Sequence, residues 1–185
     1  VPQAVSYLKQ HKGYEDLFEG YNEADLHRGQ IEKMLRLTVY RDFSKLYRFA
    51  NVEQRKFLAL YFKRYEVSVI KECLNTVFDH RDVVLNLSIF DEFFNKHSQL
   101  DINLLASSRT IEELIANLKG TEYYAPLSQL ADIERPTLFD YEMTLDLYYF
   151  AQMWKDRSKV VTKRDLEELT AAWGSKFDML NLQWI

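Results

Sequence analysis

The sequence predicts an all-α fold, and three observations lead to this class. Only 5 of the 185 residues are glycine and 3 are proline, whereas β sandwiches and barrels use such residues at their many tight turns. The 185 residues are enough for one substantial hydrophobic core or for two small ones that share an interface, and because 47% of them are apolar the chain is neither disordered nor a charged tail. These apolar residues recur at helical spacing in most segments of the chain.

The first half of the chain contains two long predicted helices. One spans residues 25–49 and carries Ile31, Met34, Leu35, Thr38 and Leu46 on one face. The second begins near Asn51, and its apolar stripe is wide enough for a helix that is buried against several neighbours. This stripe consists of Phe57, Leu58, Tyr61, Phe62, Tyr65, Val69, Cys73 and Val77. Shorter helices are predicted over residues 4–10, 14–19 and 88–97, and residues 82–87 are compatible with a brief extended segment.

Capping signals predict three helices in the second half. Thr110 and Glu113 form the pattern of a capping box, and Gly120 supplies a left-handed stop after it. Pro136 is tolerated in the first turn of a helix, so a helix that includes Met143, Leu147, Phe150 and Trp154 is predicted to begin there. Another is predicted from Thr162, with Asp165 suited to the positive end of the helix and Val161 and Leu166 placed as a hydrophobic staple.

Composition also limits the classes of partner. The net charge is −4 and the basic residues are spread along the chain, which argues against a nucleic-acid partner. Every apolar run is far shorter than the ~20 residues that a membrane helix needs, so no direct membrane insertion is expected. The single cysteine, Cys73, and the lack of a signal peptide indicate a reducing cytoplasm. The absence of an initiator methionine suggests a trimmed chain.

No residue is predicted to be catalytic, cofactor-binding or metal-binding, and no cofactor or small-molecule substrate is expected. The four histidines lack the paired spacing of a metal site and are interpreted as surface residues. Cys73 lies on an apolar stripe and is interpreted as an inert buried thiol. The segment 79–82 is interpreted as the charged end of a long helix, and the pairs Glu112-Glu113 and Glu167-Glu168 as solvated charges. The histidines are His11, His27, His80 and His97.

Adjacent aromatic residues are the one compositional feature that points to interactions. Neighbouring rings on a helix point in different directions, so some must lie at the surface or against another unit. Such rings suit either packing between units or contact with a partner protein, and the sequence leaves both open. The pairs are Phe93-Phe94, Tyr123-Tyr124 and Tyr148-Tyr149.

An internal repeat is visible when residues 65–70 are set beside residues 177–182. Both stretches begin with an aromatic residue and an acid and continue with an apolar pattern. At the same offset, Ala59 pairs with Ala171 and Tyr61 with Trp173. The repeat predicts that a helical unit occurs more than once. The apolar end at residues 182–185 then indicates either packing onto the body or removal of the rest of a helix, and we favour removal.

Two motifs carry a resemblance to a known family. Residues 174–185, Gly-Ser-Lys-Phe-Asp-Met-Leu-Asn-Leu-Gln-Trp-Ile, resemble the repeat opening of the C subunit of bacterial and archaeal V/A-type ATPases, whose eukaryotic equivalent is the d subunit. Residues 111–114 followed by residues 118–124, Leu-Lys-Gly-Thr-Glu-Tyr-Tyr, resemble the mid-repeat segment of that family. Their order and separation also fit. The earlier copy departs from the pattern, because Val69 stands where Asn181 stands later.

The resemblance implies part of a funnel-shaped protein made of repeated helical-bundle units in pseudo-threefold arrangement. Residues 1–64 would be the C-terminal part of a first unit, residues 65–176 a complete central unit, and residues 177–185 the opening of a truncated third unit. In that family the protein is a non-catalytic socket of the central stalk, cytoplasmic and peripheral to the membrane. It couples the rotor shaft to the membrane rotor ring for proton or sodium transport. The alternative is a generic helical-repeat scaffold that binds an unrelated protein.

Overall fold

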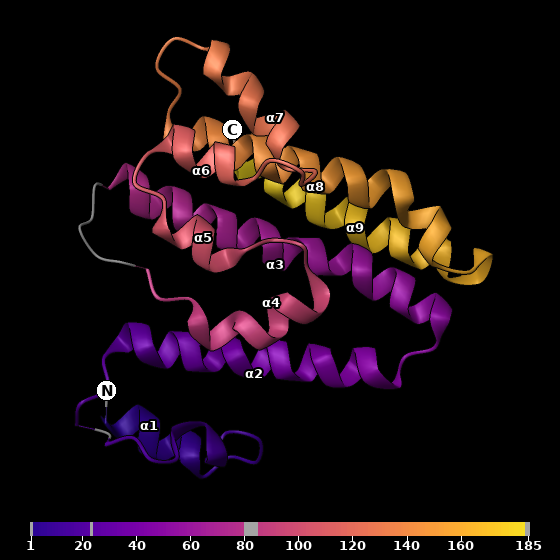
Figure 1. The fold of residues 1–185 in the computed structure, drawn as a ribbon. Helices are drawn as coiled ribbons and strands as arrows, with labels where there is room; N and C mark the ends of the chain where they lie inside the picture. The colour runs from indigo at the N-terminus through magenta and orange to yellow at the C-terminus, as the bar shows by residue number, and fades with distance from the viewer. Residues whose placement is uncertain (1, 23, 80–84, 184–185) are drawn as a thin grey trace. The chain divides into compact units, whose positions relative to one another are not determined.

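The computed structural model describes residues 2–22, 24–79 and 85–183. Helices and connecting turns make up these residues, and no strand occurs among them (Figure 1). The predicted all-α class is therefore confirmed. The chain divides into two compact units, Val1–Phe49 and Ala50–Ile185.

The smaller unit, residues 1–49, is built from α1 (Pro2–Lys9), the 3₁₀ helix η1 (Glu15–Phe18) and α2 (Arg28–Phe49). Gly13 has a φ of 96°, a left-handed conformation that glycine adopts without steric cost and that lets the chain reverse between α1 and η1. The predicted helix over 14–19 is a 3₁₀ helix, and α2 begins three residues later than predicted. The core of this unit consists of Val5, Leu17, Phe18, Leu26 and Met34.

The larger unit, residues 50–185, is organised around the long helix α3 (Val52–Phe78). Helix α3 packs against α8 (Leu138–Val160), and α8 packs against α9 (Lys163–Gln183). The elements between them are short: η2 (Ser88–Phe90), α4 (Asp91–His97), α5 (Ile102–Ser107), α6 (Ile111–Asn117), α7 (Tyr124–Ser128) and η3 (Gln129–Asp132). The predicted helix over 88–97 appears as η2 and α4, whereas α5 and α7 were not predicted.

Helices α3 and α8 run antiparallel, and polar bridges link them along part of their length. Asn75 Nδ2 donates to Glu142 Oε1 at 2.8 Å, and Lys71 Nζ lies 2.7 Å from Asp146 Oδ2. Between these bridges, the face of α8 that carries Tyr141 and Leu145 is buried. The long central helix is thereby fixed in register against its largest neighbour.

The capping chemistry explains where three helices begin. Asn51 and Gln54 form a complete capping box at the start of α3, which confirms the predicted start near Asn51. Thr137 does the same with Asp140 at the start of α8, so Pro136 lies just before the helix rather than in its first turn, and that prediction was wrong. At α6, Thr110 caps the Glu113 N–H at 3.1 Å.

The predicted capping box at Thr110 is incomplete. The carboxylate of Glu113 accepts a hydrogen bond from the Arg109 N–H at 2.7 Å instead of from the N–H of Thr110. The side chain therefore reaches one residue further back than a capping box requires. Gly120 has a φ of 88°, which confirms the left-handed stop after α6.

Helix α8 is apolar on two faces, and the sequence singled out the one that does not pack on α3. On that face, Phe150 and Trp154 lie against Phe177 of α9, with ring centroids 4.8 and 6.0 Å from it. The buried residues are Tyr141, Leu145, Tyr149 and Met153. By contrast, Leu147 is 53% exposed and Trp154 is 39% exposed. Both stripes have helical spacing, so periodicity predicted the helix but not the face that packs on α3.

The order of elements recurs along the chain. A short helix, a second short element and two long helices occur in the order α1, η1, α2 and α3, and again in the order α6, α7, α8 and α9, where η3 directly continues α7. The glycines with positive φ, Gly13 and Gly120, lie between the first and second elements of each series. This order supports the predicted repeat. The predicted repeat boundaries at 64/65 and 176/177 fall inside α3 and α9, whereas the compact units divide at 49/50.

Some predictions fall outside the described residues. These include His80, Arg81 and Asp82 of the charged segment, the first part of the extended stretch over 82–87, and Trp184 and Ile185 at the C-terminus. Residues 85–87 have no regular structure. Within the described ranges, every helix is either too short or too polar to cross a bilayer.

Candidate functional site

The most elaborate polar arrangement is centred on Glu66, on the inner face of α3. Glu66 is a buried charged residue, with 8% of the residue exposed. The Tyr123 hydroxyl donates to Glu66 Oε2 at 2.7 Å, and the Ser98 hydroxyl donates to Oε1. Each carboxylate oxygen thus receives an O–H donor, which compensates in part for the water lost on burial. We call Glu66, Ser98 and Tyr123 the buried triad, in which Glu66 and Tyr123 are buried and Ser98 is half-buried.

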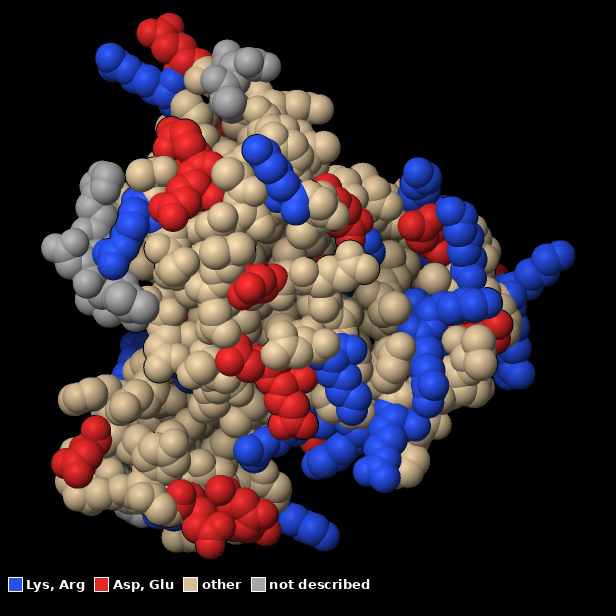
Figure 2. Space-filling model, viewed as in Figure 1, with Lys and Arg blue, Asp and Glu red and all other residues tan. Residues whose placement is uncertain are grey.

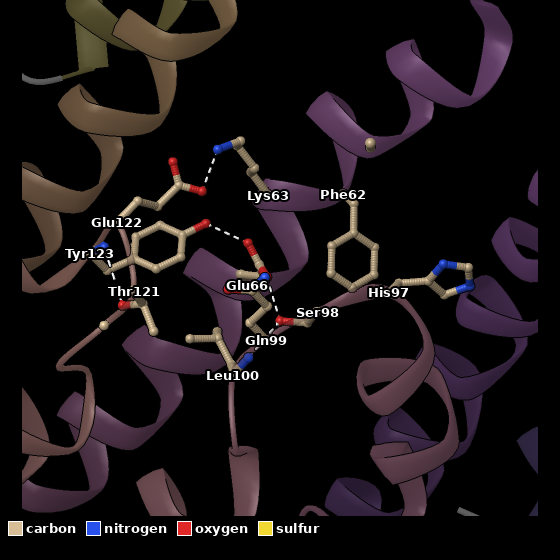
Figure 3. A pocket seen from close by; sticks show the side chains of 12 residues that line it. Phe62, Lys63, Glu66, His97, Ser98, Gln99, Leu100, Thr121, Glu122 and Tyr123 are labelled. Atoms are coloured by element: carbon tan, nitrogen blue, oxygen red, sulfur yellow. Dashed lines mark hydrogen bonds and ion pairs between the residues drawn. The ribbon is translucent and has the colours of Figure 1, made fainter. Parts of the chain in front are cut away.

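A second set of contacts lies one turn away on α3. Lys63 Nζ forms an ion pair with Glu122 Oε1, and the Tyr148 hydroxyl of α8 donates to Glu122 Oε2 at 2.7 Å. Figure 3 shows Lys63 reaching Glu122 on the same side of α3 as the contact between Glu66 and Tyr123. The two sets together join α3 and α8 with the segment after α4 and the segment after α6.

The local backbone explains how these side chains come together. Gly120 turns the chain at the end of α6, and Thr121 then accepts the Tyr123 N–H at 3.3 Å while donating to the Leu118 carbonyl at 2.7 Å. This turn aims Glu122 and Tyr123 at α3. After α4, Ser98 accepts the Leu100 N–H at 3.0 Å, which orients its hydroxyl towards Glu66.

Burial dominates the electrostatics of this region. Desolvation raises the pKa of Glu66, and the hydrogen bonds from Ser98 and Tyr123 oppose that rise because they favour the carboxylate. Burial together with the nearby Glu66 carboxylate raises the pKa of Tyr123. Burial and the neighbouring Lys96 lower the pKa of His97. Tyr123 therefore remains a hydrogen-bond donor at neutral pH.

The buried triad borders a crevice of about 270 Å³. Phe62 and His97 form the opposite wall, and Figure 3 shows the Phe62 ring between His97 and Glu66. His97 packs on Phe62 and Phe93, with ring centroids 5.6 and 5.4 Å apart, so it is half-buried rather than a surface residue as predicted. A second crevice of about 460 Å³ lies beside Tyr124 and Tyr141.

The chemistry available to the buried triad is limited. The Ser98 hydroxyl donates to a carboxylate and accepts a backbone N–H, and the imidazole ring of His97 lies beyond Phe62. The serine hydroxyl is thus engaged with the Glu66 carboxylate rather than with an imidazole. Within the described ranges, no group of three or more histidine, cysteine, aspartate or glutamate residues is arranged to hold a metal ion. The arrangement is suited to joining helices rigidly.

Cys73 lies on α3 and is 1% exposed. Burial raises the pKa of its thiol to about 12, so the thiolate that would be needed for nucleophilic attack is scarce at neutral pH. This confirms the prediction that the thiol is buried.

The adjacent aromatic residues divide between the core and more accessible positions. Tyr123 and Tyr149 are buried while Tyr124 and Tyr148 are half-buried, as expected for neighbours that point in different directions. Phe93 and Phe94 depart from this expectation, because both are buried, at 5% and 0% exposure. They lie on α4, where Phe62 of α3 contacts both rings.

The buried triad was not predicted from the sequence, although the sequence contains a signal for it. Glu66 belongs to the first copy of the repeated stretch, 65–70, and Tyr123 belongs to the Leu-Lys-Gly-Thr-Glu-Tyr-Tyr motif. The structure shows that the acid of one motif accepts a hydrogen bond from a tyrosine of the other. A search for buried acids opposite buried tyrosines in the two motifs would have paired these residues.

Comparisons with known proteins give consistent results. The sequence profile described as "ATP synthase (C/AC39) subunit" matches residues 1–185. The chain is 30% identical over 152 residues to the C subunit of the A-type ATP synthase of Methanosarcina mazei, an alignment that covers 78% of this chain and 39% of that protein. It is 23% identical over 158 residues to the C subunit of the A-type ATP synthase of Methanocaldococcus jannaschii, covering 84% and 39%.

The chain therefore spans about two fifths of the length of these curated relatives. No solved structure matches it significantly.

Proposed function

Because the chain belongs to the ATP synthase (C/AC39) subunit family, we propose that it is part of a central-stalk adaptor in a V/A-type rotary ATPase. The adaptor is a socket that receives the rotor shaft and sits on the membrane rotor ring. In this role it passes torque between ATP-driven rotation and the transport of protons or sodium ions. It works on the cytoplasmic side, peripheral to the membrane. The match of the family profile over residues 1–185 is the observation that carries this proposal.

The adaptor acts through shape and has no catalytic step of its own. Transmission of torque requires that packed helices keep their arrangement under load, and close-packed interiors resist deformation. The larger unit supports this role through its buried aromatic core and through the polar contacts of Glu66 and Glu122, which tie α3 to three other segments. A buried polar network with every group satisfied adds rigidity to such a body.

The chain is further proposed to contain parts of three related helical units of a funnel-shaped protein, over residues 1–64, 65–176 and 177–185. Each boundary lies inside a long helix, so that α3 and α9 each connect one unit to the next. The recurrence of a short helix, a second short element and two long helices supports this division.

Reconstitution with the other components tests the adaptor role. The intact parent protein is mixed with the purified shaft and with the rotor ring in detergent, and the complexes are separated by size. We expect a complex that contains shaft, adaptor and ring, and no joint complex of shaft and ring when the adaptor is omitted. A stable joint complex without the adaptor, or an adaptor that joins neither component, would contradict the proposal.

The same experiment separates this role from that of a generic helical-repeat scaffold. Such a scaffold would fold normally and would bind neither the shaft nor the ring. Circular dichroism of the recovered protein ensures that a negative result reflects a folded protein rather than a misfolded one.

A further inference from the structure

Basic residues gather at one end of the larger unit, where α8 turns into α9 and where α3 begins. Residues 53–56 and 155–165 contain seven basic residues and three acidic ones, in a chain whose net charge is −4. Figure 2 shows Lys and Arg side chains crowded at this end. The two stretches lie at the same end of the unit, because Phe57 of α3 stacks on Trp173 of α9 with ring centroids 6.2 Å apart, and Arg157 of α8 donates a hydrogen bond to Thr170, about one turn before Trp173. We call this surface the basic end; its basic residues are Arg55, Lys56, Lys155, Arg157, Lys159, Lys163 and Arg164.

Helix electrostatics account for some of these charges and not for others. Arg157 and Lys159 lie in the last turn of α8, where cations complement the negative end of the helix dipole. Lys163 and Arg164 are the first two residues of α9, where the dipole is positive and cations are unfavourable. The folding of α9 therefore gives no reason for these two cations.

Three of the cations are also available for new contacts. Lys56 is paired with Glu53, and Lys159 with Asp156. The side chains of Lys155, Lys163 and Arg164 form no ion pair or hydrogen bond with any part of the chain that the structure describes. All three are exposed. Asp165, the nearest acid in sequence to the α9 cations, instead accepts the Thr162 hydroxyl at 2.6 Å.

A preorganised stack of an arginine on a tryptophan lies next in sequence to Lys155. The Arg157 guanidinium stacks on the Trp154 ring, with its central carbon 3.9 Å from the ring centroid. Arg157 Nε also donates to Thr170 Oγ1 of α9 at 3.1 Å. Trp154 remains 39% exposed. Tryptophan and arginine that are held in place before binding are typical of the residues that dominate protein interfaces.

We propose that the basic end is a docking surface for an acidic face of a partner protein. Lys155, Lys163 and Arg164 supply the charges that attract the partner, and the Trp154–Arg157 pair supplies the anchor. A protein fits better than a lipid or nucleic-acid surface because Asp156, Asp165 and the pair Glu167-Glu168 stand among or next to the cations. A planar lipid surface meets these acids together with the cations, whereas an acidic polypeptide or protein face can place its carboxylates against the cations alone. This inference goes beyond the proposed adaptor role and does not depend on it.

A charge-reversal experiment tests the proposal. The variant Lys155→Glu/Lys163→Glu/Arg164→Glu is compared with the wild-type chain and with the matched control Lys12→Glu/Lys96→Glu/Lys119→Glu, which reverses three exposed lysines elsewhere. The probe is fluorescein-labelled poly-glutamate, and binding is measured by fluorescence anisotropy at about 50 and about 200 mM sodium chloride. We expect about a tenfold or larger loss of affinity in the first variant and less than about a threefold loss in the control at the lower salt concentration.

The folding of the first variant provides an internal check. Two of its substitutions place acids at the start of α9, where they complement the helix dipole, so its melting temperature should equal or exceed that of the wild type. Equal losses of affinity in the two variants, or no measurable binding by the wild type, would overturn the proposal.

Vesicles of phosphatidylcholine with about a third phosphatidylserine form a second arm of the test. Binding to vesicles that is lost in the first variant, with unchanged binding to poly-glutamate, would replace the protein partner with a membrane and would also overturn the proposal. Both measurements use the chain without any other component of a rotary ATPase, so a failure of the adaptor role leaves their outcome interpretable.

Discussion

The Tyr123 hydroxyl donates a 2.7 Å hydrogen bond to the buried carboxylate of Glu66, although 57 positions separate the two residues. Because Glu66 lies on the central helix and Tyr123 follows α6, this bond fixes two distant parts of the larger unit in one arrangement. Removal of either partner would leave the other polar group buried with one fewer contact.

The substitution Tyr123→Phe should therefore destabilise the protein by about 1.5–3 kcal/mol, the range for a hydrogen bond to a charged group. The ring and its packing are retained, so the loss reports the hydroxyl. The measurement is the free energy of unfolding from urea denaturation. Tyr124→Phe is the matched control at the next position; Tyr124 is half-buried, and its change should stay within about 0.5 kcal/mol. Equal effects of the two substitutions would show that the bond contributes nothing specific.

The pH dependence of stability should carry a signature of Glu66. Burial raises the pKa of Glu66 in the folded protein above its unfolded value of 4.5. The contribution of this group to stability is therefore fully present below pH 4.5 and is lost as the pH rises through the folded pKa. We therefore expect the unfolding free energy of the wild type, relative to that of Glu66→Gln, to decrease as the pH rises through that window. The measurement is urea denaturation of both proteins from about pH 3 to about pH 8.

Asp140 provides a control of opposite sign. Its hydrogen bonds to the side chain and the backbone of Thr137 lower the pKa of its carboxyl below 3.8. The contribution of Asp140 to the stability of the folded protein is therefore present above pH 3.8, and it is lost as the pH falls through the pKa of the folded state. The wild type should lose its advantage over Asp140→Asn on acidification. Parallel pH profiles for the two variants would show that the Glu66 assignment is wrong.

The thiol of Cys73 should react only when the protein opens. At 1% exposure and with a pKa raised to about 12, the folded chain presents almost no accessible thiolate. With a thiol reagent such as Ellman's reagent at about pH 8, the reaction rate should rise with urea in parallel with the unfolded fraction. Rapid, stoichiometric labelling of the native protein would contradict the buried position of Cys73.

The sequence was sufficient for the fold class and for most helix positions, because glycine scarcity, helical periodicity and caps act locally. It was sufficient for the start of α3, where Asn51 and Gln54 are three residues apart. It failed at Pro136, where the stronger signal was the Thr137–Asp140 box one residue later. The two apolar stripes of α8 were equivalent in sequence, and only tertiary packing decided that Tyr141 and Leu145 face α3 while Leu147 faces outward.

The candidate site could not be predicted from local sequence patterns, because it too depends on tertiary packing. Glu66, Ser98 and Tyr123 lie in three separate segments, and no spacing rule connects a buried acid with the hydroxyls that satisfy it. The family resemblance contained two of the three residues without relating them to each other. The basic end was similarly hidden, because its charges come from the start of α3 and from the turn between α8 and α9.

The predicted repeat makes its sharpest prediction for α9. At the repeat offset, Ile70 of α3 corresponds to Leu182 of α9, but Ile70 is 0% exposed and Leu182 is 72% exposed. If the two helices are equivalent, the outer face of α9 is covered in the parent protein by helices of a following unit, as α3 is covered here by α8. In residues 1–185, Ile70→Ala should cost about 2–5 kcal/mol and Leu182→Ala less than about 0.5 kcal/mol.

In the intact parent protein the cost of Leu182→Ala should rise to about 2 kcal/mol or more, because burial is what makes a large-to-small substitution costly. Hydrogen–deuterium exchange supplies an independent readout: amides around Met179, which is 66% exposed in this chain, should exchange more slowly in the parent protein. The matched control is Glu167→Ala at an exposed position near the start of α9, and its effect should stay within about 0.5 kcal/mol in both proteins. A Leu182→Ala effect that is equally small in both would mean that α9 has no covering unit, and the repeat would then end at α9.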